Sequence, residues 1–77
     1  MQSERKHHPA IAHVLSFFAY EHLPDRLQQI SAPFGELAHD CADRAPQSAE
    51  TTVALRKLLE AKDAAVRAAL TVSGGAA

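Results

Sequence analysis

A lysine interrupts the apolar pattern of the stretch LLEAKDAAVRAAL, which runs from Leu58 to Leu70. Lys62 stands inside an arc of apolar positions, where a helical pattern would place a leucine. An ammonium group there must reach water along its flexible stem, pair with a carboxylate, or meet an anion. Two interpretations stay open: a structural lysine, and a lysine that holds an anionic ligand at a junction between subunits.

Charged residues gather on the opposite face of the same segment. Arg56, Glu60, Asp63 and Arg67 stand three, four and seven residues apart, as in a ladder of ion pairs. Such ladders are usually solvated surface, with each pair contributing a few tenths of a kcal/mol. Arg67 lies near the end of the segment, and its planar guanidinium is also suited to binding phosphate.

Aromatic side chains cluster in the phrase SFFAYEHLP. Phe17 or Phe18 is expected to join the N-terminal segment to the core. Tyr20 is the better ligand candidate, because an aromatic face in an irregular segment can stack on a nucleobase. The imidazole of His22 could hydrogen-bond to the same base or to a phosphate.

Metal chemistry and catalysis find little support in the residue pattern. His13, His22 and His39 do not have the spacing of metal ligands, and Cys41 is the only cysteine. Cys41 falls on an apolar seam, where a thiol is more often core filler than nucleophile. No glycine-rich loop could cradle a phosphate. We therefore predict no metal, no cofactor and no enzymatic activity.

Length and charge narrow the functional class. A chain of 77 residues has room for one domain, which we take as residues 1–77 with 1–8 and 73–77 flexible. Eight Lys and Arg against nine Asp and Glu lack the basic excess that nucleic-acid binding favours. No apolar run approaches the roughly 20 residues of a membrane helix, and no signal peptide is recognised. We expect a cytoplasmic protein that binds neither nucleic acid nor membrane.

Three helical segments and no strand alternation predict an all-α fold. The first segment, PAIAHVLSFF, opens on Pro9 and places Ile11, Val14, Leu15 and Phe18 on one face. The second runs from about Pro24 to Arg44, and Pro33 is expected to kink or break it near Ser31, which could cap a restarted helix. Its apolar seam consists of Leu23, Leu27, Ile30, Phe34, Leu37 and Cys41.

The third segment, from Ala49 to Val72, has an apolar arc that one neighbour cannot cover. Ser48 is its predicted N-cap, with Glu50 in the first turn. An antiparallel two-helix hairpin with the second segment would bury one side of the arc, and the short N-terminal segment would accompany this hairpin. The alanine side would then be buried against the N-terminal segment or other copies of the chain, so we expect a homo-oligomer. The buried side holds Leu55, Leu59 and Val66, and the alanine side holds Ala54, Leu58, Ala61, Ala65 and Ala68.

A family resemblance covers Tyr20 to Leu70. YEHLPDRLQQISAPFGELAHDCA followed by VALRKLLEAKDAAVRAAL resembles small proteins of actinobacteria and their phages. It is similar to the helical-hairpin family that includes phage anti-CBASS and anti-Thoeris cyclic-nucleotide sponges. The resemblance implies a non-enzymatic trap, which would act in the host cytoplasm if phage-encoded. It would bind cyclic di- or trinucleotides, or a cyclic ADP-ribose relative, between protomers. The implied ligand-binding residues are Tyr20, His22, Lys62 and Arg67.

Two other functions stay open. A structural or protein-interaction module without a small ligand would use the same wide apolar helix. A small transcriptional regulator is disfavoured, because no helix has a basic face suited to a DNA groove.

Overall fold

The computed structural model describes residues 7–73, with side chains up to residue 71, and most of the described residues are helical. The elements are α1 (Pro9–Leu15), the 3₁₀ turn η1 (Ser16–Phe18), α2 (Asp25–Arg44) and α3 (Ala49–Ser73). Since residues 7–73 contain no strand, the all-α prediction is confirmed. None of the helices in this range combines the length and apolar character needed to cross a membrane.

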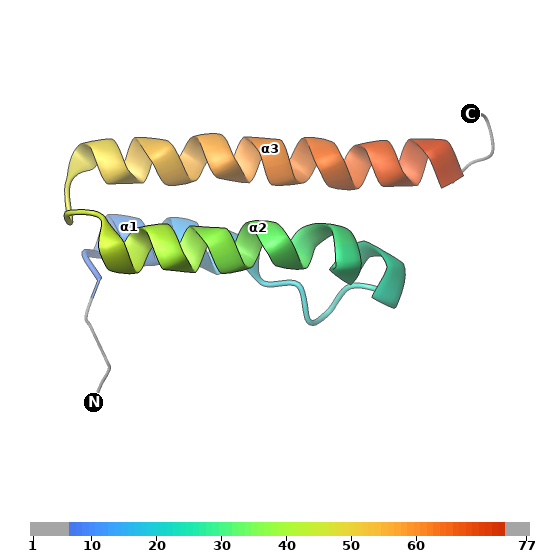
Figure 1. Cartoon of the computed structure of the whole chain (residues 1–77), viewed down its shortest axis with the longest axis horizontal. Coiled ribbons are helices and arrows are strands. Elements are labelled where there is room, and N and C mark those ends of the chain that lie inside the picture. The colour runs from blue at the N-terminus through green and yellow to red at the C-terminus, as the bar shows by residue number, and fades with distance from the viewer. Residues whose placement is uncertain (1–6, 74–77) are drawn as a thin grey trace.

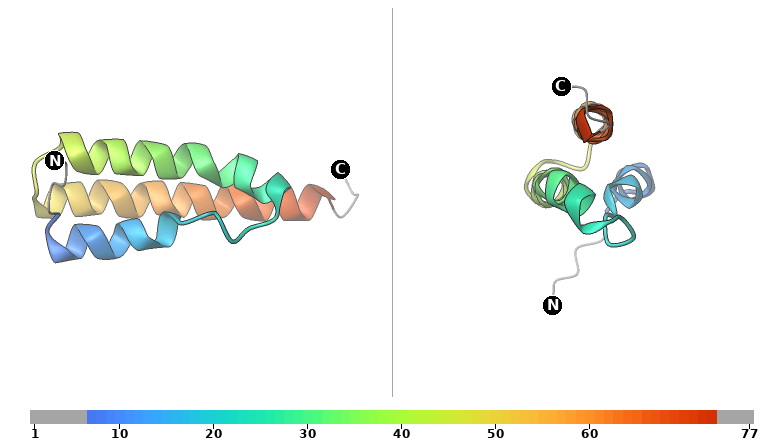
Figure 2. Two further views of the ribbon diagram at one scale, coloured as in Figure 1. Left: turned by 90° about the horizontal axis from the view of Figure 1, so that it is seen from below. Right: turned by 90° about the vertical axis from the view of Figure 1, so that its right-hand side faces the viewer.

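The three helices lie side by side around a common axis. Helices α2 and α3 run in opposite directions, joined by a short connection at one end (Figure 1). Helix α1 and η1 lie against both of them near that end, so the three helices form a triangle in end view (Figure 2). Because α1 and η1 are short, the C-terminal part of α3 extends past them.

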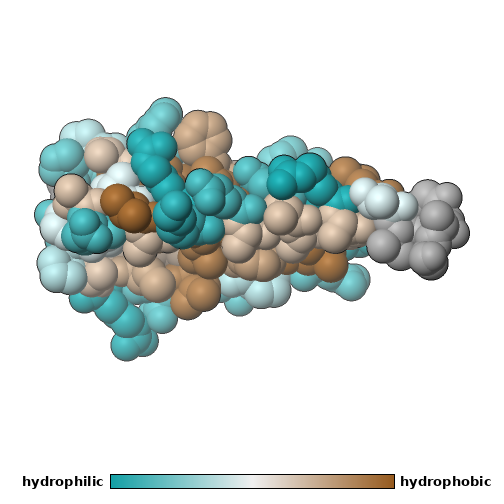
Figure 3. Space-filling view, turned by 90° about the horizontal axis from the view of Figure 1, so that it is seen from above, coloured by the Kyte–Doolittle hydropathy of each residue, from teal (hydrophilic) through white to brown (hydrophobic). Residues whose placement is uncertain are grey.

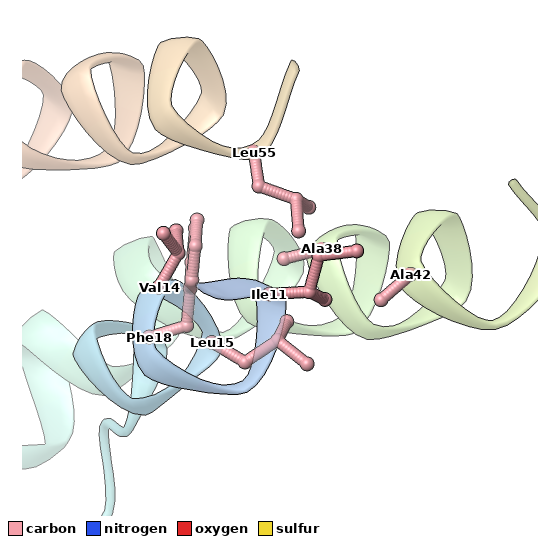
Figure 4. Close-up of a cluster of buried hydrophobic side chains, with 7 residues drawn as sticks. All are labelled: Ile11, Val14, Leu15, Phe18, Ala38, Ala42 and Leu55. Atoms are coloured by element: carbon pink, nitrogen blue, oxygen red, sulfur yellow. The ribbon is translucent and has the colours of Figure 1, made fainter. Parts of the chain in front are cut away.

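Seven buried side chains from all three helices and η1 form the core (Figure 4). Four of them come from the N-terminal segment, and all four stand on the face that the sequence predicted to be buried. The expectation that a phenylalanine joins this segment to the core is confirmed for Phe18, whereas Phe17 is 51% exposed. The core residues are Ile11, Val14, Leu15, Phe18, Ala38, Ala42 and Leu55.

The residues before α1 bind the connection between α2 and α3. Pro9 opens α1 as predicted, and His8 caps the helix, with Nδ1 accepting a hydrogen bond from the Ala10 N–H at 3.1 Å. The His8 N–H donates to Gln47 Oε1 at 2.8 Å, and His7 Nε2 lies 3.0 Å from Asp43 Oδ1. These contacts join the start of the described chain to the far end of α2.

Helix α2 differs from the prediction in two ways. The prediction was a kink or a break at Pro33; the helix continues through this residue, so the break is wrong, and Ser31 is a buried residue of the helix interior rather than a cap. The buried face is also rotated from the predicted seam, because α2 packs against α1–η1 as well as α3. Leu37, which the seam included, is 49% exposed. Small residues occupy the close contacts instead: Ser31, Gly35, Ala38 and Ala42.

Helix α3 begins as the sequence predicted. The Ser48 Oγ accepts a hydrogen bond from the Thr51 N–H at 3.4 Å, and Glu50 stands in the first turn. Leu55 is 1% exposed at the centre of the core, but Leu70 at the other end is 49% exposed. This difference follows from the arrangement of the helices, since α1 and η1 do not reach the C-terminal part of α3.

Candidate functional site

An open groove of about 660 Å³ lies between the α1–η1 segment and α2. The half-buried ring of Tyr20 forms part of its wall, as do Ser16 and the backbone around Gly35. A volume of this size lies within the range of small-molecule sites, roughly 300–1,000 Å³. The groove is therefore the candidate site, and Tyr20 is the predicted ligand residue that it contains.

A hydrogen-bonded turn holds Tyr20 in place. The Leu23 N–H donates to the Tyr20 carbonyl at 3.0 Å, and the Tyr20 N–H donates to Glu21 Oε1 at 3.3 Å. From α2, the Gln28 side-chain amide donates to the carbonyls of Glu21 at 3.2 Å and Leu23 at 2.8 Å. The segment between η1 and α2 is thus tied both to itself and to the helix that follows.

Gly35 allows this segment to approach α2. A Cβ atom at position 35 would lie 3.2 Å from the Phe18 carbonyl oxygen and 3.4 Å from Tyr20 Cε2. The first distance is tighter than an ordinary contact with backbone, so a side chain here would displace one of the two elements. A glycine is therefore used for close approach, and its hydrogen atom faces the Tyr20 ring.

The charged groups of the groove are carboxylates and imidazoles. Glu21 and Glu36 line it together with His7 and His39, and none of the Lys and Arg residues within 7–73 lines it. Carboxylates repel phosphate, so an anionic ligand in the groove needs cations from elsewhere. Within residues 7–73, no group of three or more His, Cys, Asp or Glu side chains is arranged to hold a metal ion.

Lys62 has a carboxylate partner within its own chain. Its side chain is only 13% exposed, and Nζ lies 2.9 Å from Oδ1 of the neighbouring Asp63. The stem is thus largely buried while the ammonium group meets a half-exposed carboxylate, as the structural interpretation of this lysine expected. This ion pair explains why a lysine is found inside the apolar arc, and the explanation requires no ligand.

Helix α2 carries a buried hydroxyl group at Ser31. Ser31 is fully buried, and its Oγ has no hydrogen-bond partner among the described residues. Neither Ser31 nor Lys62 lines the groove.

The remaining predicted ligand residues lie outside the groove. Arg67 is exposed on α3, and His22 is exposed in the connection before α2. Neither lines the groove, and no lining residue belongs to α3. A single chain therefore does not bring Lys62 or Arg67 together with Tyr20.

Sequence reasoning missed the other lining residues of the groove and the residues that position Tyr20. Gln28 and Gly35 position the Tyr20 segment, and His39 lines the groove opposite α1. A glycine inside a strongly helical pattern is the one signal that could have been used, since it indicates a close contact. Gln28 and His39 have no such signal, because their roles depend on how α2 is rotated against α1–η1.

No match to the chain was found among protein families, curated proteins or solved structures. Functional assignment therefore depends on the geometry of the groove and of α3.

Proposed function

We propose that this protein is a non-enzymatic trap for cyclic nucleotide signals, formed by copies of the helical hairpin of α2 and α3. Each ligand would lie at a junction between copies, with a base against Tyr20 and phosphates held by cations of a neighbouring α3. Binding of this kind in the cytoplasm would withhold an antiviral signal from its effectors, as the family resemblance implies. The proposal is carried by one observation: Tyr20 is the aromatic wall of a ligand-sized groove.

The aromatic wall suits a nucleobase. Tyr20 is half-buried, held by backbone hydrogen bonds and backed by Gly35, so its ring has a defined orientation before a ligand arrives. A preformed stacking surface lowers the ordering cost of binding. Stacking of a base on an aromatic ring is worth roughly 1–3 kcal/mol. The base would therefore contribute affinity although no Lys or Arg among the described residues lines the groove.

The need for phosphate-binding cations supports a second copy of the chain. The groove itself has Glu21 and Glu36, whereas Arg67 is exposed on α3. The same helix presents exposed apolar side chains, and the view from the α3 side shows apolar residues along much of this face (Figure 3). If α3 of one copy packed near the groove of another copy, apolar surface would be covered and Arg67 would bring positive charge to the phosphates. The exposed apolar residues of α3 include Val53, Ala54, Ala61, Ala68 and Leu70.

A protein-interaction module without a small ligand is the second candidate. The exposed apolar face of α3 favours it too, and the Lys62–Asp63 pair is complete without a ligand. In this case α3 would dock on another protein, and Tyr20 would act only as packing.

Native mass spectrometry separates the two candidates. The protein is purified alone and offered a panel of cyclic di-AMP, cyclic di-GMP, cyclic tri-AMP and cyclic ADP-ribose. A defined homo-oligomer that retains one of these ligands in stoichiometric amount supports the trap. A protein that stays empty with the whole panel, at concentrations far above cellular levels of such signals, contradicts it.

Matched variants then test the roles of the residues. Tyr20→Leu is expected to weaken binding about 5- to 150-fold, because it removes the stacking surface. Phe17→Leu is the control, since it changes an exposed aromatic residue outside the groove. Arg67→Gln is compared with Arg56→Gln, another exposed arginine of α3. Equal effects within either pair would contradict the assigned site.

A further inference from the structure

The side-chain amide of Gln28 joins α2 to the segment that carries Tyr20. Its Nε2 donates two hydrogen bonds, to the carbonyl of Leu23 at 2.8 Å and to that of Glu21 at 3.2 Å. We infer that Gln28 is a positioning residue of the ligand site, which fixes the orientation of the Tyr20 ring through this segment. The inference rests on the proposed function, because it assigns a role in binding to a residue that does not line the groove.

The two carbonyls that accept hydrogen bonds from Gln28 belong to the turn of residues 20–23. The Leu23 N–H closes this turn on the Tyr20 carbonyl at 3.0 Å, so residues 20–23 move together. The carbonyls of Glu21 and Leu23 point toward α2, and both donors of the Gln28 amide are used on them. A rotation of the turn that moved the Tyr20 ring would break these bonds.

Helix α2 holds the Tyr20 segment at two points. Gly35 stands seven residues after Gln28, two helical turns along nearly the same face. The backbone at Gly35 supports the Tyr20 ring itself, whereas Gln28 holds the far end of the turn. A rigid helix therefore sets the distance between the ring and the end of its segment. The ring needs this support, because η1 ends at Phe18 and residues 19–24 belong to no helix.

Only a hydrogen-bond donor suits position 28. A carboxylate in the Gln28→Glu variant would set an oxygen atom against two carbonyl oxygens, with almost no change in size. Gln28→Lys keeps a donor group on a flexible stem. Gln29→Glu is the matched control, since it makes the same chemical change at the next residue of α2, which is exposed.

The fluorescence of Tyr20 reports on the ring directly, because the chain has one tyrosine and no tryptophan. Acrylamide quenching is measured without ligand for the wild type and the three variants. We expect Gln28→Glu to raise the quenching constant about twofold, because the freed turn exposes the ring more often. Gln28→Lys and Gln29→Glu should stay near the wild-type value. Equal quenching in Gln28→Glu and the wild type would overturn the positioning role.

Calorimetric titration with cyclic di-AMP and cyclic tri-AMP tests the consequence for binding. Gln28→Glu should bind about tenfold more weakly than Gln29→Glu, a loss equal to two ordinary hydrogen bonds. Gln28→Lys should retain most of the affinity. Equal losses in Gln28→Glu and Gln28→Lys would overturn the inference, because packing rather than donation would then matter. Failure of the wild type to bind these two ligands, and also cyclic di-GMP and cyclic ADP-ribose, would overturn the trap and, with it, the binding role of Gln28. The quenching result would still show whether Gln28 holds the ring.

Discussion

Two leucines offer a direct test of how α2 and α3 pack. Leu55→Ala and Leu37→Ala remove the same atoms, but Leu55 is 1% exposed in the core and Leu37 is 49% exposed on α2. The apolar periodicity of the sequence alone predicts that both are buried. The three-helix packing predicts very different costs for the two changes.

The expected magnitudes follow from burial. Removing a fully buried leucine side chain costs the transfer free energy of its atoms plus a cavity term, together about 3 kcal/mol. Leu37 already has half of its surface in water and leaves no closed cavity, so its truncation should cost about 1 kcal/mol or less. In a domain of this size, 3 kcal/mol lowers the Tm by roughly 12–24 °C.

Urea unfolding followed by circular dichroism at 222 nm measures both free energies of unfolding. Each variant is compared with the wild type at low and high protein concentration, because association of copies raises the apparent stability. A Leu37→Ala cost equal to that of Leu55→Ala, independent of concentration, would refute the rotation of α2. The buried face would then be the seam of Ile30, Phe34, Leu37 and Cys41.

Three further substitutions test individual residues. Ser31→Ala should leave the protein unchanged or more stable by up to about 1 kcal/mol in urea unfolding, because the buried hydroxyl has no partner among the described residues; a clear loss of stability would contradict this. Ser48→Ala should lower the free energy of unfolding by about 1 kcal/mol through loss of the α3 N-cap, with Ser16→Ala as a hydroxyl control in α1–η1. Lys62→Met keeps the buried stem and removes the charge, so stability should change by less than about 1 kcal/mol. If the trap is correct, this variant should also lose affinity for cyclic nucleotides in calorimetry; a variant that unfolds instead would mark the lysine as structural.

The sequence predicts most of the helical framework. Pro9 and Ser48 mark helix starts because each residue type suits the first turn or its cap whatever lies nearby. The face of Ile11, Val14, Leu15 and Phe18 could be predicted because one short helix buries one stripe. Tyr20 was recognisable as a ligand candidate from its type and its place between helices, although the groove beside it was not.

The course of α2, its buried face and the ion-pair partner of Lys62 could not be predicted from local sequence patterns. A kink or a break at Pro33 was predicted from backbone chemistry alone, and α2 continues through this residue as one helix. The α2 seam was predicted for one partner, and the second partner, α1–η1, rotates the buried face toward Ser31 and Gly35. The sequence pattern assigned Asp63 to the charged face opposite Lys62, whereas in the structure its carboxylate pairs with the Lys62 ammonium group.

By itself, the sequence determined the helical class, the starts of α1 and α3 and the buried face of the N-terminal segment. These features depend on interactions within a few residues, which spacing and residue type specify. Only the tertiary structure decided the orientation of α2, the groove beside Tyr20 and the support from Gln28 and Gly35. Those features arise where segments distant in sequence approach within contact distance, and the angle of approach depends on the shapes of all the side chains between them.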